Sequence, residues 1–228
     1  MLIEEKIMHT RKPVIIINFK TYPNSTGQNA IRLAKICEKV AFETGSDIRV
    51  AVAAPDIYPI FQGVSIPVYA EHVDSYNPGR HTGSVLPEMV KAAGATGTLL
   101  NHSEHRLELK ELEESIKRAS KVSLITVVCA DTPAKAEKIA KMKPDFIAVE
   151  PPELIGGDVS VSKAKPEVIT KSVEMIKHKH GIRLLVGAGV HTRVDVLKAV
   201  ELGADGVLIA SGVDLAQNPE KVLKELLP

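Results

Sequence analysis

Short runs rich in valine, isoleucine and leucine recur eight times along the chain, and a stretch long enough for a helix or a long loop separates each from the next. The runs lack a regular alternation with polar residues, which is typical of parallel strands covered on both faces. We expect strands at Val14–Asn18, Arg49–Ala54, Val68–His72, Thr96–Asn101, Leu124–Val128, Phe146–Glu150, Arg183–Ala188 and Asp205–Ala210.

Amphipathic segments lie between these runs, with apolar residues at intervals of three and four. This spacing predicts helices that pack one face against a sheet. Gly45 and Gly203 follow two of the segments, as glycines that end helices do. The predicted helices cover residues 27–45, 107–121, 132–142, 165–180 and 193–203.

Eight strands alternating with helices favour an α/β fold of the (β/α)8 type, a closed parallel eight-stranded TIM barrel with outer helices. A doubly wound open sheet is the main alternative. The glycines of "VGAGVHT", Gly187 and Gly189, argue against it. They do not satisfy the G-x-G-x-x-G pattern, and they lie late in the chain rather than after the first strand.

A chain of 228 residues suits one large domain, and no repeat, low-complexity stretch or linker divides it. We therefore expect a single domain over residues 1–228. The charged and patternless residues 1–12 are interpreted as a short N-terminal extension.

Composition narrows the classes of partner. The 29 lysines and arginines nearly balance the 28 aspartates and glutamates, so nothing favours nucleic acid. Cys37 and Cys129 fit neither a disulfide framework nor a metal site, and with no signal-peptide pattern they predict a cytoplasmic protein. No apolar run reaches the roughly 20 residues of a membrane helix. We expect neither metal nor organic cofactor, and we interpret His178 and His180 as solvated.

In a barrel, function lies where the strands end, at their C-terminal side. Few polar side chains are expected there: Asn18 and Lys20 after the first strand, Asn101 and His102 after the fourth, and Glu150 after the sixth. Lys20 offers a fixed positive charge to a phosphorylated or enolate-forming substrate. A solvated surface lysine is the alternative.

The stretch "NHSEHR" has a pattern of its own. Asn101 with Glu104 three residues later matches a capping box, which would start a helix at His102. His102 would then lie at the positive end of a helix dipole, where a neutral imidazole can donate a hydrogen bond to a substrate oxygen. A histidine that only packs or bonds locally is the alternative. One turn of helix would direct His105 elsewhere.

The last two predicted strands end in small residues, which expose main-chain N–H groups. The stretch "SGVD" from Ser211 can open a short helix, and a helix start after strand eight suits an anion. Ordinary turn chemistry would explain either end alone. Two adjacent strands ending in this way favour a phosphate site. The small residues are Gly187, Ala188, Gly189, Ala210, Ser211 and Gly212.

Glu150 ends an apolar run at the edge of a largely apolar pocket. A partly desolvated carboxylate there suits a general base, and a structural salt bridge is the alternative. Pro151 and Pro152 stiffen the start of the next loop, while Gly156 and Gly157 leave its far end permissive. A loop of this kind is expected to act as a lid.

Taken in order, "NFK", "NHSEHR", "VEPPELIGG", "VGAG" and "LIASG" on eight strand and helix units resemble the triosephosphate isomerase family, in particular its short archaeal form. Each stretch alone is a weak signal, and the five in order are a strong one. The resemblance extends from about Val14 to the C-terminus. It implies interconversion of dihydroxyacetone phosphate and D-glyceraldehyde 3-phosphate through an enediolate, in glycolysis and gluconeogenesis and without a cofactor.

The resemblance also implies roles for individual residues. Glu150 matches the base that moves a proton between two carbons. His102 matches the group that polarises the carbonyl and shuttles protons between oxygens. Lys20 matches the cation that stabilises the enediolate, with Asn18 positioning the substrate beside it.

Three further sets are implied by position. The lid would comprise Pro151, Pro152, Glu153, Leu154, Ile155 and Gly156. Main-chain groups would bind the phosphate at Ile155, Gly156, Gly189, Ala210 and Ser211. An interface with another copy would involve Thr82, whose loop would insert near Asn18 and Glu104 of the neighbour.

This chain departs from the family pattern at several points. It has no tryptophan in the lid, where Glu153 and Leu154 stand instead, and Glu71 occupies a position where glutamine is often found. Ala210 and Ser211 replace a glycine pair of longer relatives. The short chain implies a homo-oligomer, a tetramer first and a dimer as the alternative.

Two other functions remain open from the residues alone. One is a barrel isomerase acting on a ribose-phosphate intermediate, and the other is a barrel that binds phosphorylated metabolites as a sensor or scaffold. The combination of Lys20, His102 and Glu150 argues against a pure binder, which has no use for a positioned base.

Overall fold

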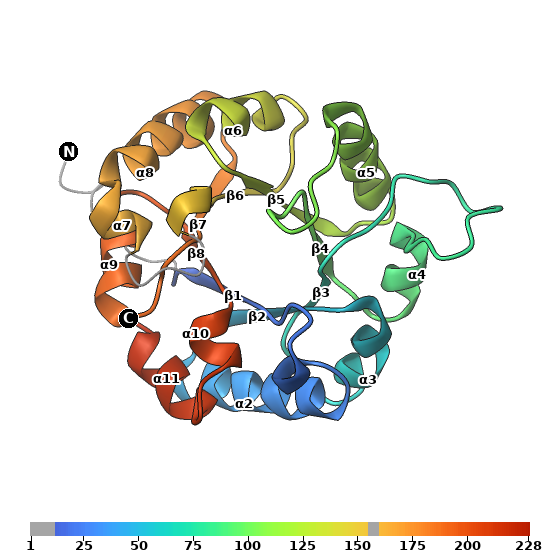
Figure 1. Cartoon of the computed structure of the whole chain (residues 1–228), viewed down its shortest axis with the longest axis horizontal. Coiled ribbons are helices and arrows are strands. Elements are labelled where there is room, and N and C mark those ends of the chain that lie inside the picture. Colours follow the sequence, from blue (N-terminus) through green and yellow to red (C-terminus); the bar gives the residue numbers. More distant parts are fainter. Residues whose placement is uncertain (1–11, 155–159) are drawn as a thin grey trace.

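The computed structural model describes residues 12–154 and 160–228. Its strands form a closed parallel barrel in chain order, in which β1 pairs with both β2 and β8 (Figure 1). The predicted fold class is therefore confirmed. The strands are β1 (Val14–Asn18), β2 (Asp47–Val52), β3 (Val68–Ala70), β4 (Gly97–Leu100), β5 (Ile125–Ala130), β6 (Phe146–Val149), β7 (Arg183–Val186) and β8 (Gly206–Ile209).

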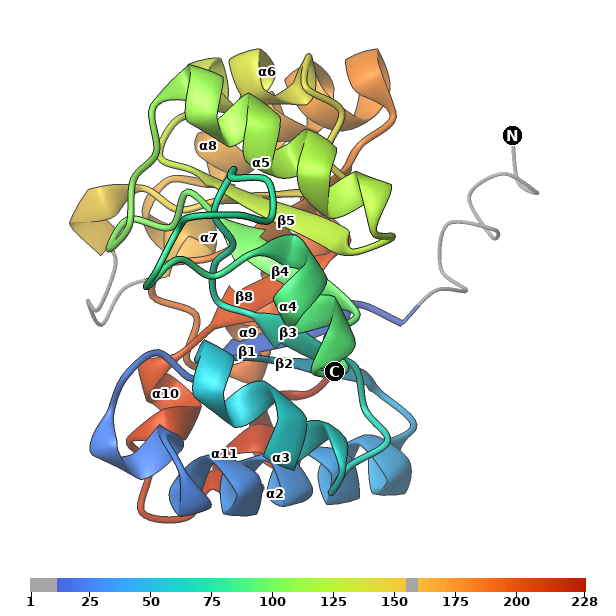
Figure 2. The same cartoon turned by 90° about the vertical axis from the view of Figure 1, so that its right-hand side faces the viewer.

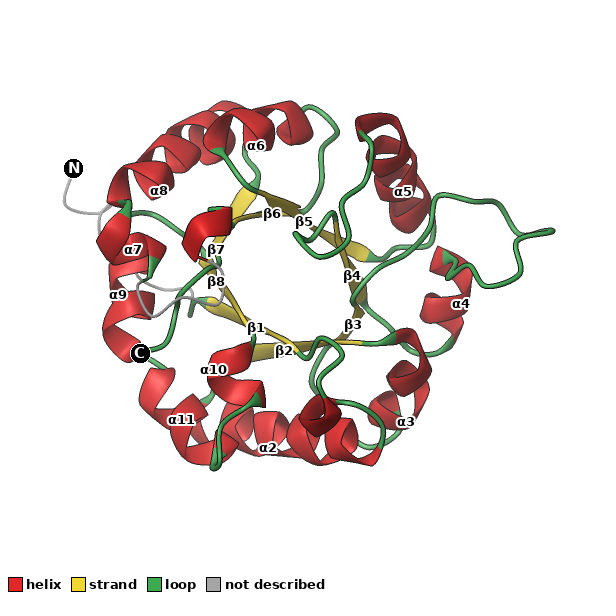
Figure 3. Ribbon diagram, in the orientation of Figure 1, coloured by secondary structure: helices red, strands yellow, loops and turns green. Residues whose placement is uncertain are grey.

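Helices form the outer ring, with the strands at the centre (Figure 3). Turned by 90°, the barrel lies between α2, α3 and α11 on one side and α5, α6 and α8 on the other (Figure 2). The α-helices are α2 (Gln28–Thr44), α3 (Ile57–Phe61), α4 (Pro87–Ala92), α5 (Leu109–Lys121), α6 (Pro133–Ala140), α7 (Val161–Ala164), α8 (Pro166–Ser172), α9 (Arg193–Glu201), α10 (Ser211–Asp214) and α11 (Pro219–Leu226).

Shorter helical turns occupy several connections. They are the 3-10 turns η1 (Pro23–Ser25), η2 (Ala54–Asp56) and η3 (Pro152–Leu154), and the π-helical stretch η4 (Val173–His178) that continues α8. All five predicted helices are present. The one expected at 165–180 is divided among α8 and η4.

Most strands end earlier than the apolar runs suggested. The ladder of β3 stops at Ala70, and that of β6 at Val149, so that Glu150 is the first residue beyond its strand. Its N–H still bonds to the carbonyl of Ala130 at 2.8 Å. At β6 the apolar run overestimates the strand because Glu150 and Pro151, which begin the loop, are buried as well.

Two apolar layers explain why the runs show no alternation. Ile15 and Ile17 of β1 belong to the core between barrel and helices, whereas Ile16 belongs to the cluster inside the barrel with Tyr69 and Phe146. Both faces of each strand are therefore removed from water, and apolar side chains are favoured at every position.

Arginines close the N-terminal end of the barrel. Arg49 donates to the Tyr69 hydroxyl (2.7 Å) and to both carboxylate oxygens of Asp47 (2.7 and 2.9 Å). Arg183 lies 3.7 Å above the ring centre of Phe146. Arg49 is therefore paired at the N-terminal end of the barrel, and Arg183 covers an aromatic ring there.

The connection from β3 to α4, residues 71–86, extends beyond the ring of helices (Figure 1). Tyr76 and His81 stack within it, with ring centroids 4.4 Å apart. Thr82 is exposed at this loop. The loop therefore offers a projecting surface, as the interface prediction requires.

The seam between β1 and β8 leaves no room for a side chain at Gly206. A Cβ there would lie 2.7 Å from the main-chain nitrogen of Val14, so Gly206→Ala should force the strands apart and lower the free energy of unfolding by about 1–3 kcal/mol. Guanidinium unfolding measures the change. Gly63→Ala is the control, because its Cβ would meet other atoms at 3.5 Å or more. Equal stability of the two variants would contradict this account.

Candidate active site

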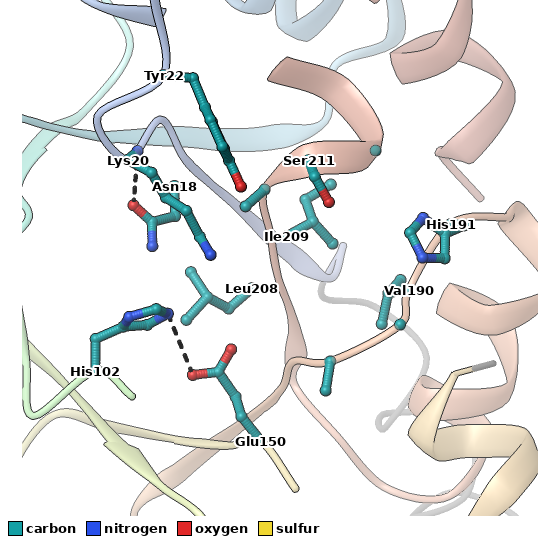
Figure 4. Close-up of a pocket in the computed structure, with 14 residues that line it drawn as sticks. Asn18, Lys20, Tyr22, His102, Glu150, Val190, His191, Leu208, Ile209 and Ser211 are labelled. Carbon is teal, nitrogen blue, oxygen red and sulfur yellow. Dashed lines mark hydrogen bonds and ion pairs between the residues drawn. The ribbon is translucent and has the colours of Figure 1, made fainter. Parts of the chain in front are cut away.

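A pocket opens at the C-terminal end of the barrel, and its walls come from both ends of the chain (Figure 4). Strand closure places β1 beside β8 there, so residues nearly 200 positions apart face one another. Among the predicted site residues, the pocket is lined by Asn18, Lys20, His102, Glu150, Gly189, Ala210 and Ser211.

Glu150 is 6% exposed and directs its carboxylate toward His102 (Figure 4). The distance from Oε2 to the histidine Nε2 is 3.9 Å. This oxygen has no hydrogen-bond partner among the described residues. A buried acceptor without a partner is poised to take a proton from a molecule in the pocket.

Gly187 makes space for that carboxylate. A Cβ at this position would lie 2.6 Å from Cγ and 2.8 Å from Cδ of Glu150. The glycine that follows β7 therefore leaves the space that the Glu150 carboxylate occupies. Its role is spatial, in addition to any contribution to an anion site.

Cys129 on β5 is a neighbour of Glu150. Burial, followed by the charge of Glu150 and a hydrogen bond to it, raises the pKa of the Cys129 thiol well above its ordinary value. The sulfur therefore remains a neutral thiol and adds no second negative charge next to the carboxylate.

His102 is 8% exposed and lies on a compact turn, not in a helix. The N–H of Glu104 donates to its Nδ1 at 3.3 Å. A ring nitrogen that accepts carries no proton, so the proton of the neutral imidazole is on Nε2, the atom that faces Glu150.

The predicted capping box at Asn101 is wrong. Asn101 has a φ of 58°, and its side chain donates to the Cys129 carbonyl and accepts from the Leu107 N–H, both at 2.9 Å. These bonds hold 101–107 as a turn, and α5 begins only at Leu109. The helix dipole thus does not act on His102, and Oε2 of the Glu104 carboxylate lies 3.6 Å from Nδ1 of the ring.

Glu104 also forms an ion pair with Lys20, whose Nζ lies 2.7 Å from Oε1 of the glutamate. Burial alone would lower the pKa of Lys20, but the hydrogen bond and charge of Glu104 outweigh it and raise the pKa above its ordinary value. The N–H of Lys20 bonds to Oδ1 of Asn18 at 3.2 Å. Asn18 therefore holds the main chain that carries the cation.

The ends of β7 and β8 form the opposite wall. Ala188 and Gly189 both have positive φ, 71° and 66°, and α10 begins at Ser211. The short helix is confirmed, but its N-cap is Ala210, which makes no side-chain cap bond. The Ser211 hydroxyl points toward the pocket instead (Figure 4).

The comparisons with known proteins agree with this geometry. The model of the triosephosphate isomerase family matches residues 13–226. The chain is 50% identical to the triosephosphate isomerase of Methanobacterium bryantii over 216 residues, 94% of this chain and 96% of the relative. Those of Methanothermus fervidus and Saccharolobus solfataricus are each 49% identical over 217 residues, 95% of this chain and 98% and 96% of theirs.

The chain belongs to the triosephosphate isomerase family. The predicted activity, interconversion of dihydroxyacetone phosphate and D-glyceraldehyde 3-phosphate, is confirmed with it. Of the three functions that the residues left open, the triose phosphate isomerase is the one supported.

The predicted lid of this triosephosphate isomerase is described only in part. Pro151 is buried, and η3 follows it. Glu153, which had no expected role, pairs with Lys165 beyond α7, and the hydrogen bond from that lysine lowers the pKa of the glutamate. Ile155 and Gly156, predicted for the lid and the phosphate site, lie outside the described residues.

Sequence reasoning missed several residues of the triosephosphate isomerase pocket. Tyr22 lies opposite Ser211, and His191 follows the glycine-rich end of β7 (Figure 4). Both stand two residues after a predicted site residue, which is the signal that could have found them. The remaining ones are Val190, Leu208 and Ile209, whereas Ala188 and Gly212 were expected among the small residues at the strand ends.

Helices of residues 12–154 and 160–228 include none with the length and apolar character to cross a membrane. In the same ranges, no three histidine, cysteine, aspartate or glutamate side chains gather in a way that could hold a metal ion.

Gly187→Ala should damage turnover more than folding. Because the new Cβ displaces the Glu150 carboxylate, and a misplacement near 1 Å costs about 100-fold, we expect kcat to fall about 100-fold. Steady-state assays in both directions measure it, with circular dichroism to verify the fold. The distant Gly63→Ala should keep normal kcat, and a normal kcat in Gly187→Ala would contradict the proposed fit.

Proposed function

We propose that Glu150 is the base of the isomerisation and transfers a proton between the two carbons of the triose phosphate through an enediolate. The observation that carries this proposal is the buried, unpartnered Oε2 that faces the pocket 3.9 Å from Nε2 of His102. A glutamate base with a neutral histidine is the established description for this enzyme family.

His102 would act on the oxygens while Glu150 acts on the carbons. Its Nε2–H is aimed into the pocket because Nδ1 is occupied by the Glu104 N–H. A neutral imidazole can donate to the substrate carbonyl and recover the proton from the other oxygen as the enediolate rearranges.

Lys20 would stabilise the negative charge of the enediolate. Glu104 raises the pKa of Lys20 and so keeps it protonated, and Asn18 holds its main chain by accepting from the Lys20 N–H. A preorganised charge in a pocket shielded from water stabilises a developing oxyanion more than water does.

The phosphate of the substrate would bind at the opposite wall, against main-chain groups of Gly189, Ala210 and Ser211 with Ile155 and Gly156 from the lid. The support is local: two adjacent strands end in small residues, and α10 starts at the pocket. This binding keeps the reacting carbons between Glu150 and His102.

Glu150→Gln tests the base. The amide has the same shape and cannot accept the proton, so kcat should fall by about 10²–10⁴-fold while the fold persists. Glu174→Gln is the matched control: this glutamate lies in η4, outside the pocket, and its side chain is exposed. Assays of both variants with either triose phosphate measure the effect, and near-normal turnover of Glu150→Gln would overturn the assignment.

For its setting, we propose a single-domain enzyme of the cytoplasm in glycolysis and gluconeogenesis. The balanced charge and the two buried free cysteines support the compartment. The reversible reaction suits both directions of triose phosphate flow.

We also propose a homo-oligomer, a tetramer in preference to a dimer. The projecting β3–α4 loop supports it, because exposed Thr82 lies on this loop and the half-exposed Glu104 lies next to Lys20 at the mouth. The β3–α4 loop of a neighbouring copy would contact Asn18 and Glu104 at the mouth of the barrel.

Thr82→Arg tests this interface. An arginine at a packed contact adds bulk and charge, so we expect smaller species in analytical ultracentrifugation and lower activity at low protein concentration. Thr170→Arg is the matched control, since Thr170 is an exposed threonine on α8. An unchanged sedimentation profile of Thr82→Arg would exclude the loop from the interface.

A further inference from the structure

Asp195 is a buried carboxylate next to the turn that follows β7. It is the third residue of α9, its exposed fraction is 2%, and it lies outside the lining of the pocket. A carboxylate removed from water is costly unless several donors bond to it. Its donors therefore identify the segments that this residue joins.

One carboxylate oxygen of Asp195 holds the end of the turn after β7. Oδ2 accepts from the N–H of His191 at 3.2 Å, from the N–H of Thr192 at 2.9 Å and from the Thr192 hydroxyl at 2.7 Å. The same hydroxyl accepts from the Asp195 N–H at 3.3 Å, which completes a capping box at the start of α9. Three donors on one oxygen fix the main chain at residues 191 and 192.

The other oxygen of Asp195 holds the start of α7. Oδ1 accepts from the Ser160 hydroxyl and from Nζ of Lys163, both at 2.8 Å. The N–H of Val161 also donates to the Ala188 carbonyl at 3.3 Å, so α7 and the turn after β7 are joined at two places. Lys163 balances the negative charge of Asp195, which would otherwise disfavour an anion in the pocket nearby.

The turn held by Asp195 is a wall of the proposed phosphate site. Residues 188–191 line the pocket, and His191 lies on the same side as Ser211 (Figure 4). A Cβ at Gly212 in α10 would lie 3.2 Å from Nδ1 of His191, so the turn lies directly against the start of α10. A displacement of the turn would therefore alter both parts of the phosphate site.

We propose that Asp195 is a positioning residue for the substrate phosphate, because its Oδ2 bonds fix the turn at residues 188–192 whose main-chain groups bind that phosphate. Asp195 acts through the turn and does not touch the substrate. The inference rests on the phosphate site proposed above and extends it to a residue outside the pocket.

The alternative is a cap that stabilises α9 and nothing more. Loss of such a cap would lower the free energy of unfolding and leave phosphate binding unchanged. Loss of a positioning residue would also weaken phosphate binding, while the reacting groups of Glu150 and His102 keep their places.

The test measures competitive inhibition by inorganic phosphate in Asp195→Ala and Asp195→Asn. The alanine removes all the bonds of the carboxylate, so Ki for phosphate should rise and kcat/KM for D-glyceraldehyde 3-phosphate should fall, each about tenfold. The asparagine oxygen can keep the bonds to the two N–H groups, and its Ki should stay within about threefold of wild type. An unchanged Ki in Asp195→Ala, or equal losses in the two variants, would overturn the proposal.

A second pair of variants tests the same bonds with less risk to folding. Thr192 is exposed, and Thr192→Val removes only its hydroxyl, whereas Thr192→Ser retains it. We expect Ki for phosphate to rise about threefold in the valine variant and to stay at the wild-type value in the serine variant. Equal Ki values in these two variants would contradict the proposal.

D-Glyceraldehyde, which lacks the phosphate, separates a displaced wall from a damaged reaction centre. Asp195→Ala should isomerise it with kcat/KM within about twofold of wild type, because the effect is confined to the phosphate. A loss as large as that with D-glyceraldehyde 3-phosphate would place the damage at the reacting carbons and overturn the proposal.

Asn218→Ala is the matched control for loss of a helix cap. The Asn218 side chain accepts from the Lys221 N–H at 3.0 Å at the start of α11, outside the pocket lining. This variant should lose stability and keep the wild-type Ki for phosphate, and a rise equal to that of Asp195→Ala would overturn the proposal. Wild type that phosphate does not inhibit would exclude the phosphate site itself, whereas an inhibited wild type with an unchanged Asp195→Ala would exclude only the role of Asp195.

Discussion

Pairing of β1 with β8 is the constraint on which the site depends. It converts eight parallel strands into a ring, so that no strand edge is left unpaired and every strand ends at the same mouth. Lys20 from the start of the chain then faces Ser211 from near its end. The seam tolerates only glycine at position 206, because a side chain there would force β1 and β8 apart.

The two ends of the closed barrel differ in how their charged side chains are paired. At the N-terminal end, Arg49 is paired with Asp47 and Tyr69, and Arg183 lies over the ring of Phe146. At the other end, Glu150 Oε2 is buried without a partner in the described part of the chain. The carboxylate that faces the pocket is therefore left with an unoccupied acceptor, whereas the arginine at the closed end is paired.

Much of this could be predicted from the sequence, and the failures have physical reasons. The barrel and the positions of Lys20, His102 and Glu150 follow from strand ends alone. The helix expected at His102 failed because the Asn101 side chain bonds to Cys129 and Leu107, and distant partners of this kind leave no local signal. Tyr22 and His191 belong to loops whose direction only the folded chain defines.

Several backbone conformations at the mouth are unfavourable for the residues that adopt them. Lys20, Asn101 and Ala188 have φ angles of 52°, 58° and 71°, a region that residues with a side chain seldom occupy. Each such conformation costs about 1–3 kcal/mol, which the rest of the barrel must offset. Glycine would relieve that strain at any of the three positions, and it would also free the main chain that carries Lys20, His102 or the turn after β7. The strain and the fixed geometry of the mouth therefore have the same source.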